Sequence, residues 1–66
     1  MTRIETIKRI AILDNLIVSA MDTPSPAAFR SIRRMVRETA AMSDLADDIK
    51  AALLTQENVC AMGIAA

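Results

Sequence analysis

The longest apolar stretch of the chain lies between residues 10 and 21, with the sequence IAILDNLIVSAM. Nine of these twelve residues are apolar, and only Asp14, Asn15 and Ser19 interrupt them. On a helix each residue turns by about 100°, so the apolar side chains would cover most of the circumference, as in a helix buried on several sides. The stretch is too short to cross a bilayer, which takes about 20 residues. It predicts either the central helix of a small bundle or a helix that forms one side of a contact between two chains.

The first helix is predicted over residues 3–22. Thr2 and Glu5 have the spacing of a capping box at its start. At its end, Pro24 and Pro26 each disfavour helical geometry in the residue before them. The apolar residues of this helix form two ridges, Ile4, Ile7, Ala11 and Val18 on one and Ile10, Leu13, Ile17 and Ala20 on the other. Two ridges permit packing against two neighbours.

The second helix is predicted over residues 26–42, with Ser25 as N-cap and Pro26 at the first helical position. Its apolar face consists of Phe29, Ile32, Met35 and Val36. Four arginines project within about 100° of one another on the other side and are called the arginine stripe: Arg30, Arg33, Arg34 and Arg37. Glu38 has the spacing to pair with Arg34.

The third helix is predicted over residues 44–61, with Ser43 as its N-cap. Asp44, Asp47 and Asp48 place negative charge in its first turns, where the helix dipole favours it. One face carries Leu45, Ile49, Ala52, Leu53, Gln56 and Cys60, whereas Leu54 points away from it. Gly63 is expected to end the helix. The prediction is an all-α, compact three-helix domain over residues 1–66, with the first helix central.

The composition restricts the chemistry of the protein. A 66-residue chain buries a small core and usually needs a disulfide, a metal or a partner. With one cysteine and no histidine there is no intramolecular disulfide, no zinc site and no catalytic pair with histidine. We therefore expect no enzymatic activity, no metal and no cofactor, and stabilisation by association. The free cysteine and the lack of a secretory signal pattern predict a cytoplasmic protein that is not inserted in a membrane.

Charge is distributed unevenly although the net charge is zero. The arginine stripe precedes the aspartate-rich start of the third helix. It has three interpretations: a solvated face, a contact with an acidic protein surface, or a grip on phosphates. Nucleic acid is disfavoured, because the chain lacks net positive charge and stacking aromatics.

Three further features have a structural and a functional interpretation. The five methionines fit core filling or an adaptable binding groove. Cys60 lies on an apolar face, where burial would make its thiol inert. Asn15 and Ser19 share one face of the first helix, which is either its solvent edge or a polar strip recognised by a partner.

Residues 23–54 carry a resemblance to a known family. The positions that match are Pro24, Pro26, Arg34, Val36, Ser43, Asp44 and Asp48. In these the chain resembles the small VbhA-type antitoxins that inhibit Fic adenylyltransferase toxins. The resemblance implies a three-helix protein that wraps around a toxin. The family's inhibitory motif, Ser-x-x-x-Glu-Gly, is absent, since Ser19 is followed by Asp22 and Thr23 with neither glutamate nor glycine in place.

These observations predict a small protein-binding regulator or inhibitor, antitoxin-like, that masks a partner's surface through apolar helix packing. The alternatives are a structural homodimerising helical module and, third, a nucleic-acid binder acting through the arginine stripe. The predicted partner-binding residues are Ile10, Leu13, Leu16, Ile17 and Met21 with Arg30, Arg33, Arg34 and Arg37.

Overall fold

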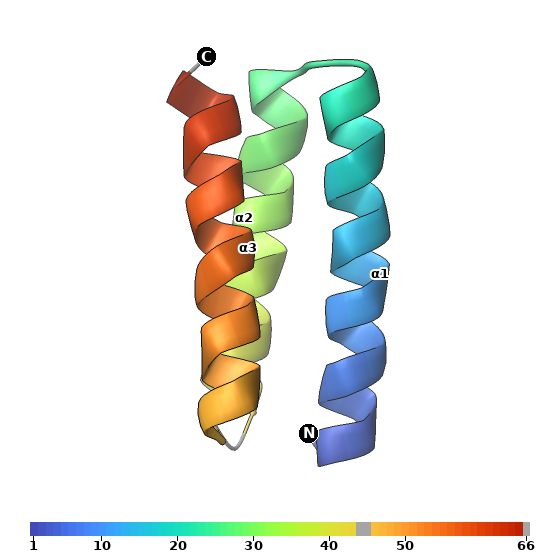
Figure 1. The fold of residues 1–66 in the computed structure, drawn as a ribbon, viewed down its shortest axis with the longest axis vertical. Coiled ribbons are helices and arrows are strands. Elements are labelled where there is room, and N and C mark those ends of the chain that lie inside the picture. The colour runs from blue at the N-terminus through green and yellow to red at the C-terminus, as the bar shows by residue number, and fades with distance from the viewer. Residues whose placement is uncertain (44–45, 66) are drawn as a thin grey trace.

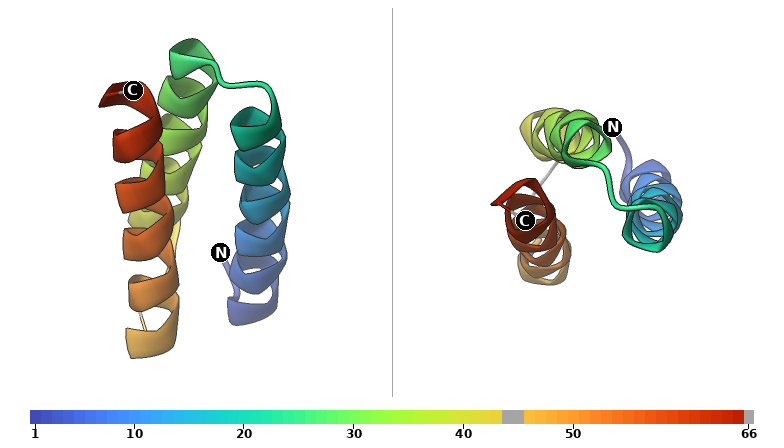
Figure 2. Two further views of the ribbon diagram at one scale, coloured as in Figure 1. Left: turned by 45° about the horizontal axis from the view of Figure 1, so that its top comes forward. Right: turned by 90° about the horizontal axis from the view of Figure 1, so that it is seen from above.

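The computed structural model describes residues 1–43 and 46–65 and consists of three helices. They are α1 (Arg3–Asp22), α2 (Pro26–Met42) and α3 (Asp47–Ala65). The helices run up, down and up along the long axis of a bundle about 32 Å long (Figure 1). Seen from above, they stand at the corners of a triangle (Figure 2). The all-α, three-helix prediction is confirmed.

The predicted start of α1 forms by local hydrogen bonding. The Thr2 hydroxyl accepts from the Glu5 amide and the Glu5 carboxylate accepts from the Thr2 amide, each at 3.2 Å, which completes the capping box. This hydrogen bonding from the Thr2 side chain and backbone lowers the pKa of the Glu5 carboxyl. Thr2 therefore fixes where α1 begins.

The predicted start of α2 is formed in the same way. The Ser25 hydroxyl accepts from the Ala28 amide at 3.3 Å, and Pro26 occupies the first helical turn. Both starts depend only on residues within one turn, which is why the sequence pattern identifies them.

The core lies between the three helices. Its buried apolar residues are Leu13, Ile17 and Ala20 from α1, Phe29, Ile32 and Val36 from α2, and Ile49, Leu53 and Cys60 from α3. The apolar faces predicted for α2 and α3 are therefore confirmed, and Leu54 lies outside the core as expected.

The first helix is not the central one. α2 and α3 pack more closely with each other than either does with α1. Only one face of α1 is buried, at Thr6, Leu13, Ile17 and Ala20. In a bundle of three helices each helix meets its neighbours through one face. The other apolar side chains of α1 consequently remain at the surface.

The third helix differs from its prediction at both ends. It begins at Asp47, so Ser43 is not its N-cap; Ser43 ends α2 in an extended conformation, and its hydroxyl donates to the Thr39 carbonyl at 2.6 Å. The predictions made for Asp44 and Leu45 lie outside the described residues. At the other end, α3 continues through Gly63 to Ala65, because the glycine serves helix packing and not termination.

Candidate protein-binding surface

Exposed apolar side chains are concentrated on α1. Among residues 1–43 and 46–65, ten large apolar residues are exposed, and six of them belong to this helix: Ile4, Ile7, Ile12, Leu16, Val18 and Met21. Ile4 and Val18 are the most exposed of the six, with 67% and 63% of their surface accessible. Large apolar groups gathered on one element are typical of an interaction surface, whereas scattered ones are ordinary.

The predicted apolar contact residues separate into two groups. Leu13 and Ile17 lie in the core of the chain itself, and Ile10 is half-buried against that core. Leu16 and Met21 are exposed. Of the five, only Leu16 and Met21 are thus exposed, with 38% and 59% of their surface accessible.

Four exposed large apolar residues of α1 are not among the predicted contact residues. Ile4, Ile7 and Val18 belong to the first of the two predicted ridges, and Ile12 belongs to neither. Both ridges have helical spacing and similar hydrophobicity, so the pattern alone does not say which one faces the core. The position of α2 and α3 decides this, and that information is tertiary.

The arginine stripe lies along α2 as its spacing predicted. All four arginines line one shallow region together with Glu38 and Ala41, and Arg33 alone among the four is half-buried. The predicted pairing of Glu38 with Arg34 is not formed. The ion pairs within residues 1–43 and 46–65 are Arg3–Asp48 and Arg37–Glu57.

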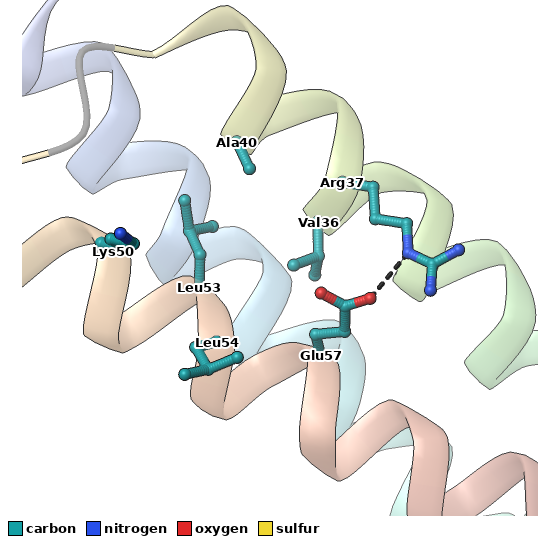
Figure 3. Close-up of a pocket in the computed structure, with 7 residues that line it drawn as sticks. All are labelled: Val36, Arg37, Ala40, Lys50, Leu53, Leu54 and Glu57. Atoms are coloured by element: carbon teal, nitrogen blue, oxygen red, sulfur yellow. Dashed lines mark hydrogen bonds and ion pairs between the residues drawn. The ribbon is translucent and has the colours of Figure 1, made fainter.

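Arg37 forms an ion pair between two helices. Its Nε donates to Glu57 Oε1 at 2.6 Å, from α2 to α3, at the rim of a small hollow (Figure 3). Val36, Ala40, Leu53 and Leu54 provide the apolar part of this hollow. Arg30 and Arg34, in contrast, are exposed and form no ion pair among the described residues. The part of the stripe open to an anionic partner is therefore centred on these two.

A polar contact crosses from α3 to the middle of α1. The buried Gln56 donates through Nε2 to Asp14 Oδ1 at 2.7 Å and to the Ile10 carbonyl at 2.9 Å. The Gln56 Oε1 atom is buried and has no hydrogen-bond partner among the described residues. Asp14 remains exposed. The polar residues in the middle of α1 thus have two environments. Asp14 is hydrogen-bonded to α3, whereas Asn15 and Ser19 are exposed on the outer side of the helix.

Cys60 is fully buried, and burial raises the pKa of its thiol. A neutral, inaccessible thiol is a poor nucleophile, which fits the inert interpretation.

Within residues 1–43 and 46–65 no three Cys, Asp or Glu side chains come together as metal ligands would. No helix in the same residues is long and apolar enough to span a bilayer.

Comparisons with protein-family models, curated proteins and solved structures found no match for this chain.

Proposed function

We propose that the protein is a small regulator or inhibitor that binds another protein through the exposed apolar face of α1. The observation that carries this proposal is the concentration of six exposed large apolar side chains on one helix. Burying such a surface removes apolar area from water at about 25 cal/mol per Å². The core does not need these side chains, so they are free to serve a partner.

An antitoxin-like role is one form of this proposal. The resemblance of residues 23–54 to VbhA-type antitoxins suggests a toxin as the class of partner. Because Ser19 is not followed by the family's glutamate and glycine, inhibition would proceed by covering the partner's surface and not by inserting a glutamate.

Site-specific photo-crosslinking in the source cell tests the proposal. A photoreactive amino acid replaces Val18 on α1 or, as the matched control, Leu54 on α3, which is similarly exposed at 57%. We expect a defined adduct with another protein from position 18 and none from position 54. With that protein purified, Val18→Glu should weaken binding at least about tenfold, while Leu54→Glu leaves it unchanged, since only the former puts a charge into the apolar contact.

Two results would count against this function. The absence of an adduct from position 18, or equal adducts from both positions, would mean that α1 has no special role. An adduct with the mass of two copies of the chain would support the homodimerising module instead.

A further inference from the structure

The exposed face of α1 contains a second heptad pattern beside the buried one. Its residues alternate at spacings of three and four and are all exposed; we call them the outer seam: Ile4, Ile7, Ala11, Asp14, Val18 and Met21. Spacings of three and four bring side chains onto one stripe of a helix, which is how coiled-coil helices contact each other. Five of the six are apolar, and Asp14 is the exception.

Each half of the outer seam borders a mostly apolar hollow, one between α1 and α3 and one lined by all three helices. Ile7 lines one hollow with Ile10, Ile49 and Ala52, and Asp48, which is paired with Arg3, lies at the same hollow. Met21 lines the other with Phe29, Val59, Met62 and Gly63. Ile7 and Met21 are fourteen residues apart, which corresponds to about 21 Å along the helix. These hollows can accept large apolar side chains of a helix lying along the seam.

Asp14 lies midway between the two hollows, seven residues from Ile7 and seven from Met21. Its Oδ1 atom accepts a hydrogen bond from Gln56 of α3, so the carboxylate lies at the α1–α3 border, and it lines neither hollow itself. A helix bound along the seam would cover Asp14. A carboxylate removed from water needs an opposite charge or strong hydrogen bonds.

A second copy of the chain does not supply that charge. In a parallel pairing of two outer seams, each Asp14 would face the other Asp14. In a fully overlapped antiparallel pairing, Asp14 would oppose Ala11 of the other copy, and the two carboxylates would lie about one turn apart. Both arrangements bring like charges together in an apolar contact, which is unfavourable.

We propose that the outer seam binds an amphipathic helix of another protein, with two large apolar residues fourteen positions apart and a lysine or arginine midway between them. The apolar residues enter the two hollows, and the basic residue pairs with Asp14. This inference rests on the proposed function and specifies its partner.

A selection experiment tests the inference. Helical peptides of about three heptads, with fixed apolar anchors and a randomised central residue, are displayed and selected on the full-length protein. We expect lysine or arginine to be enriched at the centre at least about tenfold over neutral residues, as a charge-assisted pair allows. Asp14→Asn keeps an oxygen that accepts from Gln56 but removes the charge, and it should abolish this preference. Asp14→Lys should select aspartate or glutamate instead.

The outcomes separate this inference from the proposed function. If peptides bind but the residue selected at their centre is the same for the wild type and both variants, the proposal of a basic partner helix is wrong. Binding of a partner through α1 would still be supported. If no peptide is enriched on the wild type or on either variant, both are wrong for this surface. Circular dichroism and melting of each variant establish that the fold is retained, since Asp14 is exposed and outside the core.

Discussion

Gly63 and Phe29 pack directly against each other where α2 begins and α3 ends. A Cβ atom placed on Gly63 would lie within 2.4–2.6 Å of three ring atoms of Phe29, and the ring is only 4% exposed. Glycine is therefore present in α3 because the ring of the single aromatic residue needs the space. The usual function of a glycine near a helix end, termination, does not apply here.

We expect Gly63→Ala to destabilise the protein, although alanine favours a helix by about 1 kcal/mol over glycine. Overpacking typically costs about 1–3 kcal/mol, so a net loss of up to roughly 2 kcal/mol in the free energy of unfolding should appear in urea titrations. In a Phe29→Leu background, where the ring is absent, the same substitution should be neutral or stabilising. A gain in stability in the wild-type background would mean that the ring moves aside freely.

Buried polar residues were the least predictable part of the core. Thr6, Thr39 and Gln56 are buried, although the sequence pattern placed only Gln56 on a core face. The Thr39 hydroxyl donates to the Met35 carbonyl at 2.8 Å and accepts from Arg9 Nε at 2.9 Å. Such hydrogen bonds compensate for burial. The Met35 carbonyl lies one turn away in the same helix, but Arg9 belongs to α1, and no local pattern reveals a partner from another helix.

At the scale of helices, one ion pair joins the start of α1 to the start of α3. Arg3 contacts Asp48 through both carboxylate oxygens, at 3.2 and 2.5 Å. The hydrogen bond with Arg3 is the main reason that the pKa of Asp48 is lowered. A carboxyl whose pKa is lowered by folding stabilises the fold above its unfolded value of about 3.9 and loses that effect as the pH falls through the folded value.

Asp48→Asn should therefore reduce the melting temperature at neutral pH and flatten its decline on acidification below about pH 4. Both residues are exposed, so the effect should be small and should shrink in high salt. The matched control is Asp47→Asn. It also removes one negative charge from the first turn of α3, but Asp47 forms no ion pair within residues 1–43 and 46–65. Thermal melts at a series of pH values compare the three proteins. Identical acid profiles for Asp48→Asn and the wild type would show that the pair contributes nothing.

The sequence predicts the start of a helix correctly where the residues that form the cap lie within one turn of each other. The starts of α1 and α2 follow from Thr2 with Glu5 and from Ser25 with Pro26, which act within a single turn. The predicted start of α3 is wrong. Ser43 is a residue type that often caps helices, but its hydroxyl donates a hydrogen bond to the Thr39 carbonyl of α2. The candidate surface was half predictable: apolar excess on α1 was evident, but the choice between its two ridges required the packing of the other helices.

At the scale of the whole molecule, the two faces of α1 differ in their surroundings. Its inner face completes the core with Leu13, Ile17 and Ala20. Its outer seam remains apolar except at Asp14. In this arrangement Asp14 has the position that a polar residue occupies in coiled coils, where it costs stability but selects the partner. We infer that Asp14 keeps the outer seam from closing on a second copy of the chain.

Asp14→Leu should consequently turn the protein into a homodimer. The substitution makes the outer seam continuously apolar and removes the two carboxylates that would repel each other across the pairing. Light scattering should give a monomer mass for the wild type and a dimer mass for the variant. The melting temperature of the variant alone should rise with protein concentration over roughly a hundredfold range, as mass action requires.

Asp14→Asn is the matched control for this experiment, because it removes the charge while leaving a polar group in the seam and an acceptor for Gln56. The repulsion is gone, but a single asparagine in a helix seam costs stability, so this variant should dimerise much more weakly than Asp14→Leu. If Asp14→Leu stayed monomeric at every concentration, the outer seam would not be a surface on which helices pair. If the wild type were already a dimer with a concentration-dependent melt, Asp14 would be no barrier, and self-association through α1 would replace the partner helix as the use of this face.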